Sequence, residues 1–132
     1  GLLCGHNVPA CGFSIGFERV FAVMEERGMF GPPRPAADVL VTVPAGEAAA
    51  EALRIAAELR AAGLRADMYP GTARLAAQFE LGEKKGIGWA VIPDARELAR
   101  GGVNVRELAA RRNTFVPRTQ LAGWLRARLG RP

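Results

Sequence analysis

Cys4, His6 and Cys11 are the residues near the start of the chain whose types could ligate a metal ion. A structural zinc site takes four such ligands in closely spaced pairs, and the sequence offers no fourth cysteine or histidine. We therefore predict no metal site. With one histidine in 132 residues, neither a Ser-His-Asp nor a Cys-His catalytic set can be assembled. Two cysteines are too few for a disulfide framework, so we expect reduced thiols in a cytoplasmic protein.

A second set of side chains is of the kind that contacts a polyanion. Arg74, Gln78 and Lys85 fall four and seven residues apart in a predicted helix, a spacing that allows them to share a face. Arg111 and Arg112 lie together in a predicted turn. Guanidinium and ammonium groups bind phosphate oxygens, and an amide can hydrogen-bond the edge of a base. These residues favour binding rather than covalent catalysis.

The distribution of charge points to the same part of the chain. Residues 1–37 carry three arginines and three glutamates, whereas residues 38–132 carry 15 Lys and Arg against 10 Asp and Glu. The whole net charge of +5 therefore lies in the second part, and a basic domain suits a polyanion. No apolar run approaches the roughly 18 residues that cross a bilayer, so we expect no membrane segment. Because the chain starts with neither a methionine nor a signal peptide, we expect a fragment of a longer protein.

Strands and helices alternate in the basic part of the chain. The predicted strands cover residues 38–43, 64–69, 88–92, 103–106 and 114–116, and the predicted helices cover residues 47–62, 72–85 and 117–129. The order β-α-β-α-β implies parallel strands with right-handed crossovers, and the closing β-β-α implies an edge hairpin. We predict an α/β domain with a mixed, mainly parallel five-stranded sheet flanked by three helices.

Apolar spacing also predicts which side chains face that sheet. We expect Leu53 and Phe79 to point inward, Thr72 to cap the second helix, and Trp89 and Trp124 to lie in the core.

The first block is predicted to be a strand over residues 11–16 followed by a helix. Phe17, Val20, Phe21 and Met24 recur at helical spacing, so one face of this helix is apolar. One strand and one helix cannot enclose a core, so this block needs partners. A proline-rich linker over residues 31–37 separates it, as residues 1–30, from a domain over residues 38–132.

Residues 8–20, Val-Pro-Ala-Cys-Gly-Phe-Ser-Ile-Gly-Phe-Glu-Arg-Val, resemble motif 3 of class II aminoacyl-tRNA synthetases in its histidyl form. The resemblance implies that Arg19 contacts the ATP triphosphate, which agrees with the affinity of a guanidinium for phosphate oxygens. It also implies that Gly16 lets the nucleotide approach the backbone closely.

The second block resembles the anticodon-binding domain of the same family. The similar segments are Asp-Val-Leu-Val at 38–41, Ala-Ala-Glu-Leu-Arg-Ala-Ala-Gly at 56–63, Leu-Ala-Ala-Gln-Phe at 75–79, Glu-Lys-Lys-Gly-Ile at 83–87 and Gly-Val-Asn-Val-Arg-Glu-Leu at 102–108. The resemblance implies recognition of the tRNA(His) anticodon stem-loop, with Tyr69 available to stack on a base. The candidate contacts are Tyr69, Arg74, Gln78, Lys84, Lys85, Arg111 and Arg112.

The chain departs from the family at several of these places. The family often has a basic residue where Ala76 or Ala77 stands, and a glycine after the third strand, where this chain has Pro93. The hairpin turn at 110–113, Ala-Arg-Arg-Asn, usually reads Thr-Gly-Glu-Gln.

Motifs 1 and 2 and the histidine-binding signatures are missing from these residues. The resemblance therefore implies a full-length parent that is a homodimeric histidine–tRNA ligase using ATP with Mg²⁺, while we expect this chain alone to hold no cofactor and to be inactive. A non-catalytic synthetase-like paralogue, acting in tRNA sensing or regulation, is the alternative. A third possibility is a doubly wound α/β domain that binds a small ligand or a protein at its strand ends.

Overall fold

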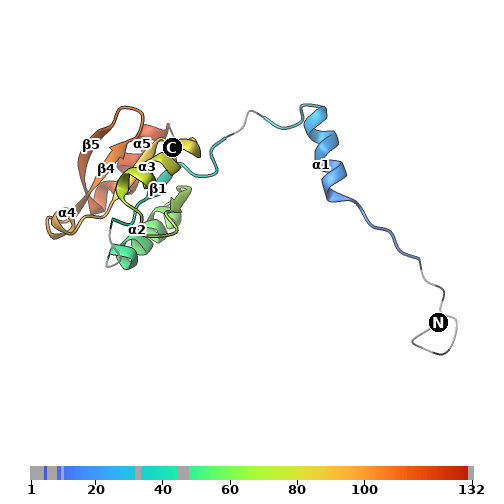
Figure 1. The fold of residues 1–132 in the computed structure, drawn as a ribbon, viewed down its shortest axis with the longest axis horizontal. Helices are drawn as coiled ribbons and strands as arrows, with labels where there is room; N and C mark the ends of the chain where they lie inside the picture. Colours follow the sequence, from blue (N-terminus) through green and yellow to red (C-terminus); the bar gives the residue numbers. More distant parts are fainter. Residues whose placement is uncertain (1–4, 6–8, 10, 32–33, 45–47, 131–132) are drawn as a thin grey trace. The chain divides into compact units, whose positions relative to one another are not determined.

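The computed structural model describes residues 5, 9, 11–31, 34–44 and 48–130. The chain divides into two compact units, Gly1–Pro33 and Arg34–Pro132 (Figure 1). This boundary falls inside the segment predicted as a linker. At the far end of that segment, however, Ala37 is buried in a hydrophobic cluster, so the residues from Arg34 onward belong to the second unit.

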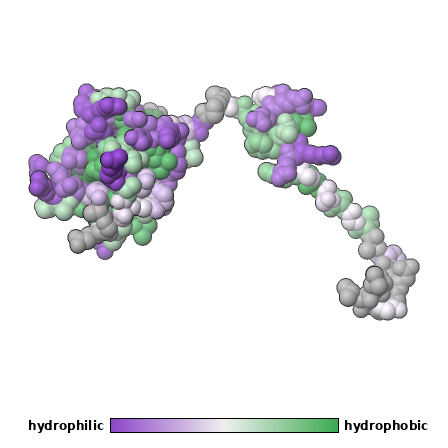
Figure 2. Space-filling model, in the orientation of Figure 1, coloured by the Kyte–Doolittle hydropathy of each residue, from purple (hydrophilic) through white to green (hydrophobic). Residues whose placement is uncertain are grey.

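The described residues of the first unit contain one helix, α1 (Phe17–Glu26), as predicted. Residues 11–16, predicted as a strand, form neither strand nor helix. A strand is stabilised by hydrogen bonds to a neighbouring strand, and the described residues of this unit supply none. The apolar side chains of α1 are consequently open to solvent: Phe17 is 76% exposed and Phe21 47%. Hydrophobic surface is visible on this unit in Figure 2.

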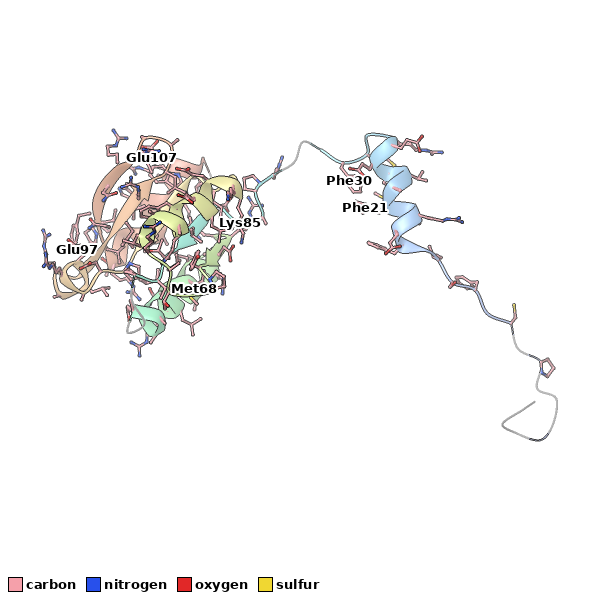
Figure 3. The ribbon with its side chains drawn as sticks, viewed as in Figure 1. Phe21, Phe30, Met68, Lys85, Glu97 and Glu107 are labelled. Carbon is pink, nitrogen blue, oxygen red and sulfur yellow. The ribbon has the colours of Figure 1, made fainter. Side chains whose placement is uncertain are left out.

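An aromatic contact between Phe21 and Phe30 packs the residues after α1 against the helix. The rings of Phe21 and Phe30 lie side by side, with their centroids 4.7 Å apart (Figure 3). Phe30 follows the helix and folds back on it after Gly28, which adopts a left-handed φ of 62°. In the part of the chain that the structure describes, no helix is long and apolar enough to cross a membrane.

The second unit contains the five predicted strands. They are β1 (Val39–Val41), β2 (Ala66–Met68), β3 (Trp89–Ile92), β4 (Gly102–Glu107) and β5 (Arg112–Pro117). The sheet order is β2-β1-β3-β4-β5. Strand β1 pairs in parallel with β2 and β3, whereas β4 is antiparallel to both of its neighbours. Four strands thus share one direction and β4 alone runs against them, which confirms the prediction of a mixed, mainly parallel sheet.

Within residues 34–44 and 48–130, this unit has the three predicted α-helices and a fourth α-helix that was not predicted. The predicted helices are α2 (Ala49–Ala61), α3 (Leu75–Lys84) and α5 (Leu121–Leu129), the last preceded by the 3₁₀ turn η2 (Arg118–Gln120). The additional helix is α4 (Ala95–Ala99). It begins where the Asp94 carboxylate accepts a hydrogen bond of 2.9 Å from the backbone N–H of Arg96. The sequence held this capping signal, an aspartate followed three residues later by Glu97.

Alternate residues of the strands face two hydrophobic clusters. Val39 and Val41 belong to the larger cluster, which also contains Ile55 and Leu59 of α2 and Leu125 of α5. That side of the sheet is therefore covered by two helices. Full burial of each large aliphatic side chain stabilises the fold by roughly 1.5–3 kcal/mol. Trp89 and Trp124 pack on this cluster edge to face, with centroids 5.3 Å apart, in partly buried positions.

The other side of the sheet carries a smaller cluster under α3. Its buried members include Leu40 of β1, Ala90 of β3 and Leu108 just after β4. Helix α3 packs closely here because Gly82 faces the sheet: a Cβ at this position would lie 2.8 Å from Cδ1 of Leu108. One helix therefore covers the β1 and β3 part of this side.

Two details of helix orientation differ from the predictions. Leu53, expected to face the sheet, is 55% exposed, because the buried stripe of α2 runs through Ala52, Ile55 and Leu59. Thr72, expected to cap the second helix, lies outside it: α3 begins after Arg74, whose side chain makes no capping hydrogen bond.

Hydrogen-bonded ion pairs connect Arg118, directly after β5, to two glutamates of α2. The guanidinium of Arg118 donates hydrogen bonds of 2.8 and 2.9 Å to the two carboxylate oxygens of Glu58 and one of 2.5 Å to Glu51. These hydrogen bonds lower the pKa of both carboxyls and raise the pKa of Arg118. The turn after β5 is thereby tied to the helix packed beneath it.

Candidate nucleic-acid interface

Gln78 is the clearest correction to the predicted site. It was expected on an exposed helical face, but its side chain is 0% exposed. Its Oε1 accepts a hydrogen bond of 2.8 Å from the N–H of Val43, and its Nε2 donates to the carbonyls of Val43 (2.7 Å) and Ala73 (2.5 Å). The amide completes the hydrogen bonding of backbone groups at the end of β1, where the ladder has stopped. Gln78 therefore holds α3 against the sheet and is not placed to contact a base.

The other predicted residues of α3 lie at its two ends. Arg74 is exposed at the N-cap position. Lys84 is exposed in the last turn, where a cation also interacts favourably with the helix dipole. Lys85, the C-cap residue, donates a hydrogen bond of 2.6 Å to Asp67 of β2. With Gln78 turned inward, the shared face expected for Arg74, Gln78 and Lys85 does not form.

Tyr69 directly follows β2, and its ring is only partly accessible. The residue packs against both hydrophobic clusters, and its N–H donates to the carbonyl of Val41 at 3.0 Å. Tyr69 and Lys85 thus belong to the β2 edge of the sheet, while Arg112 lies in β5 at the opposite edge. Four strand spacings, about 19 Å, separate these edges. The predicted residues therefore do not form one compact cluster.

The hairpin between β4 and β5 carries the remaining two predicted arginines. Arg112 forms an ion pair of 2.9 Å with Glu107, its cross-strand partner. Arg111 adopts a φ of 52°, the one left-handed φ of a residue other than glycine in the described part of the chain. An L-residue in this conformation costs about 1–2 kcal/mol. The turn thus holds a large cationic side chain in a backbone conformation that favours glycine.

Beside this hairpin, part of the sheet lies beyond α3. Register places Asn104 opposite Phe115 and Arg106 opposite Asn113 on the side of the sheet that faces α3. We call these four residues the open strip; none of them is fully buried. Their neighbours along the same strands, such as Val103 and Val105, point to the other side and are 0% exposed. Figure 3 labels Glu97, on α4, and Glu107, at the hairpin end of β4.

Arg106 connects the open strip to α3. Its guanidinium carbon lies 4.8 Å from the ring centroid of Phe79, and it donates a hydrogen bond of 3.0 Å to the amide oxygen of Asn113. Phe79 was expected to face the core; it is half-buried, with Arg106 on its ring. The guanidinium plane is thereby fixed by a stacking contact and a hydrogen bond.

A pocket of about 230 Å³ lies between α3 and the hairpin. It is lined by Ala76, Phe79, Glu80, Glu83, Arg106 and Arg111. An aromatic ring, two guanidinium groups and two carboxylates thus surround one small space. Unpaired bases are bound by stacking on aromatic and arginine side chains and by hydrogen bonds to their edges. This set can stack on a planar heterocycle, accept hydrogen bonds from it and donate to it.

Of the predicted residues, only Arg111 lines this pocket. Asn104, Arg106, Asn113 and Phe115 were not among the predicted site residues. The alternation of valine with Asn and Arg in residues 103–106 was a usable signal, because it indicates a strand with one apolar and one polar side. What the alternation alone leaves undecided is whether a helix covers the polar side.

Arg19 and Gly16 lie at the start of α1. Gly16 is the N-cap residue with a φ of −70°, and a Cβ there would meet only Cβ of Arg19, at 3.9 Å. This backbone does not itself require a glycine. Arg19 is exposed in the first turn, where a guanidinium beside free helical N–H groups fits a phosphate. These two residues fit one phosphate contact of a nucleotide rather than its whole site.

Cys4, His6 and Cys11 were the candidate metal ligands in the sequence. Cys4 and His6 lie outside the described residues, and Cys11 is an exposed free cysteine. Among the described residues, no group of three His, Cys, Asp or Glu side chains is placed to hold a metal ion.

Sequence comparison identifies the class to which this fold and interface belong. The anticodon binding domain family matches residues 38–128, which is most of the chain. The chain belongs to this family.

The individual relatives are more specific. Histidine–tRNA ligase of Anaeromyxobacter dehalogenans is 38% identical over 120 residues, covering 91% of this chain and 29% of the relative. The mitochondrial histidine–tRNA ligase of Bos taurus is 35% identical over 129 residues, covering 95% and 26%. Both matches extend beyond the anticodon-binding domain into the first block. The chain spans less than a third of the length of these relatives.

A solved structure agrees with this relationship. Histidyl-tRNA synthetase from Nostoc sp. PCC 7120 superposes with a TM-score of 0.69 at 29% identity, over 87% of this chain and 28% of that protein. The resemblance to the C-terminal part of histidyl-tRNA synthetases, predicted from the sequence, is thereby confirmed.

Proposed function

We propose that the second unit recognises the anticodon stem-loop of tRNA(His). The observation that carries the proposal is the pocket in which Arg106, fixed on Phe79, meets Arg111 beside two glutamates. Such a pocket takes one unpaired base, and the arginines beside it can reach the flanking phosphates. Arg74 and Lys84, exposed at the ends of α3, add positive charge for the backbone of the loop.

The proposal extends to the longer protein of which this chain would be the C-terminal part. That parent would be a homodimeric, cytoplasmic histidine–tRNA ligase that activates histidine with ATP and Mg²⁺ and transfers it to tRNA. Arg19 would contribute a triphosphate contact there, and Gly16 would leave room for the nucleotide. The chain of 132 residues would bind tRNA but would not aminoacylate it, because one arginine at a helix start is not an active site.

The test is the affinity of the 132-residue chain for a tRNA(His) anticodon stem-loop, measured across a salt series beside a loop with exchanged anticodon bases. We expect tighter binding to the natural loop, with a log–log salt slope of about −0.7 for each phosphate contact. Equal, weak binding to both loops would contradict anticodon recognition and would favour the non-catalytic paralogue.

A substitution distinguishes binding in the pocket from nonspecific attraction of the RNA to positive charge. Arg106→Ala is expected to cost about 1–3 kcal/mol of binding free energy and to reduce the preference for the natural loop. The matched control is Arg54→Ala, which removes the same charge from α2, on the other side of the sheet. If both variants weaken binding equally, the pocket is not the recognition site.

A further inference from the structure

A second stacked pair lies on the same side of the sheet, next to the pocket. The guanidinium carbon of Arg100 is 4.7 Å from the ring centroid of Phe115. Phe115 belongs to the open strip, and Arg100 is the C-cap residue of α4, two residues before β4 begins. The pair therefore repeats, at the α4 end of the strip, the arrangement that Arg106 and Phe79 make near the hairpin.

Gly102 makes room for this second pair. A Cβ on Gly102 would lie 2.5 Å from Cζ of Phe115 and 2.6 Å from the carbonyl oxygen of Val116. Any side chain at Gly102 would thus push the far edge of the ring off the strand. With glycine there, the ring of Phe115 packs against the backbone of β4, and this contact fixes its position.

The groups of this pair are available to a ligand. Arg100 is exposed, and within residues 34–44 and 48–130 its guanidinium donates no hydrogen bond and forms no ion pair. Asn104, directly opposite Phe115 in the register, is half-buried, and its side-chain amide has no hydrogen-bond partner among these described residues. A stacked cationic plane thus stands beside an amide that can donate to and accept from a base edge.

Strand register sets the spacing along the open strip: Phe115 of one pair lies opposite Asn104, and Arg106 of the other pair follows Asn104 on the same strand. Asn104 and Arg106 are two residues apart on β4, which is about 7 Å along a strand. That is the scale on which neighbouring bases of an unstacked strand are spaced. Open sheet surfaces that bind RNA stack two or three successive bases on side chains in this way.

We propose that Arg100, held on Phe115 over Gly102, is a second stacking position for an unpaired base, adjacent to the base held in the Arg106 pocket. The inference rests on the proposed anticodon-loop function and extends it from one base to two. Stacking accepts every base, so this position contributes affinity and places the strand, while the pocket supplies the discrimination.

The experiment measures stem-loop affinity for the whole chain and for Arg100→Ala and Arg100→Lys. Both variants are expected to bind roughly tenfold more weakly, because lysine keeps the charge but lacks the plane. Arg96→Ala, an exposed arginine on the same helix, is the charge control and should bind like the unchanged chain. Thermal unfolding of each variant confirms that the surface substitutions leave the fold intact.

Stem-loops with single abasic positions then identify the base. One abasic position should weaken the unchanged chain but cost Arg100→Ala nothing further, since the stacking partner is already lost. Every other position should weaken both proteins equally.

The outcomes separate the two proposals. If Arg100→Lys binds like the unchanged chain while Arg100→Ala flattens the salt slope by about 0.7, Arg100 contacts a phosphate and the stacking proposal is overturned, although anticodon-loop binding stands. Additive losses at all abasic positions would overturn it as well. If the unchanged chain shows no preference for the natural loop, the proposed function fails and this inference fails with it.

Discussion

The two sides of the five-stranded sheet are built from alternate residues of the same strands, yet they carry opposite chemistry. On β4, Val103 and Val105 are fully buried beneath α2 and α5, while Asn104 and Arg106 lie on the side that α3 covers only in part. The covered side is held together by aliphatic packing, whereas the partly open side combines a smaller hydrophobic cluster with a buried amide and stacked arginines. The comparison shows that a sheet gains a binding surface where helices leave part of one side uncovered, and that the composition of its strands does not decide this.

Substitution of Gln78 is expected to have the largest effect, because it removes the buried amide that holds α3 on the partly open side of the sheet. Gln78→Met keeps most of the volume but leaves the N–H and carbonyl of Val43 without partners. Each unsatisfied buried group costs about 1–3 kcal/mol, so for these two groups we expect a loss of about 2–6 kcal/mol in the free energy of unfolding, measured with urea. The matched control is Ala77→Met, a neighbouring α3 position without such bonds. Equal losses in both variants would mean that the amide is not what holds α3.

A substitution in the hairpin turn is expected to change stability and stem-loop affinity in opposite directions, which tests the role of the partly open side in binding. Arg111→Gly removes the Cβ from a left-handed residue, and we expect the free energy of unfolding to rise by up to about 1 kcal/mol. The same change deletes a cation from the pocket, so affinity for the stem-loop should fall. Denaturant titration and binding measurements on one sample check both directions. A variant that is less stable than the unchanged chain would show that Arg111 makes contacts that outweigh its backbone cost.

The smallest expected effect concerns the covered side and its dependence on pH. Hydrogen bonds from Arg118 lower the pKa of Glu51 and Glu58 below the ordinary value of 4.5. Because the folded pKa values are depressed, this contribution to stability is complete above pH 4.5 and is lost as the pH falls through the folded values.

Urea midpoints measured at several pH values test this effect. Arg118→Met should flatten the acid side of the profile, whereas Arg112→Ala, which removes an exposed ion pair from the hairpin, should leave it unchanged. A profile that is equally steep in both variants would show that other carboxyl groups govern the loss of stability in acid.

Much of the fold was predictable because its signals are local. The β-branched run at Val39–Val41, the helix-forming stretch of α2 and the glycine that ends it all specify their own structure. The strand predicted over residues 11–16 does not form, because a local apolar pattern makes a strand only when another strand pairs with it.

The candidate site was less predictable for a related reason. Helical spacing puts Arg74, Gln78 and Lys85 on one face but does not say which face meets the sheet. Here Gly82, by allowing the closest approach, turns Gln78 inward with it. Charge counting likewise identified Arg111 but passed over Phe79, whose importance depends on Arg106 lying on its ring.

The sequence by itself determined the order of elements, the mixed sheet, the basic character of the second unit and the family, because each follows from local propensity, alternation or a continuous motif. Only the tertiary structure decided which polar residues face solvent together. Asn104, Arg106, Asn113 and Phe115 come from two strands, and they form a surface only because strand register aligns them and α3 reaches no further across the strip than the contact of Phe79 with Arg106. Register and helix docking are set by contacts between residues distant in sequence, so pattern within one segment does not contain them.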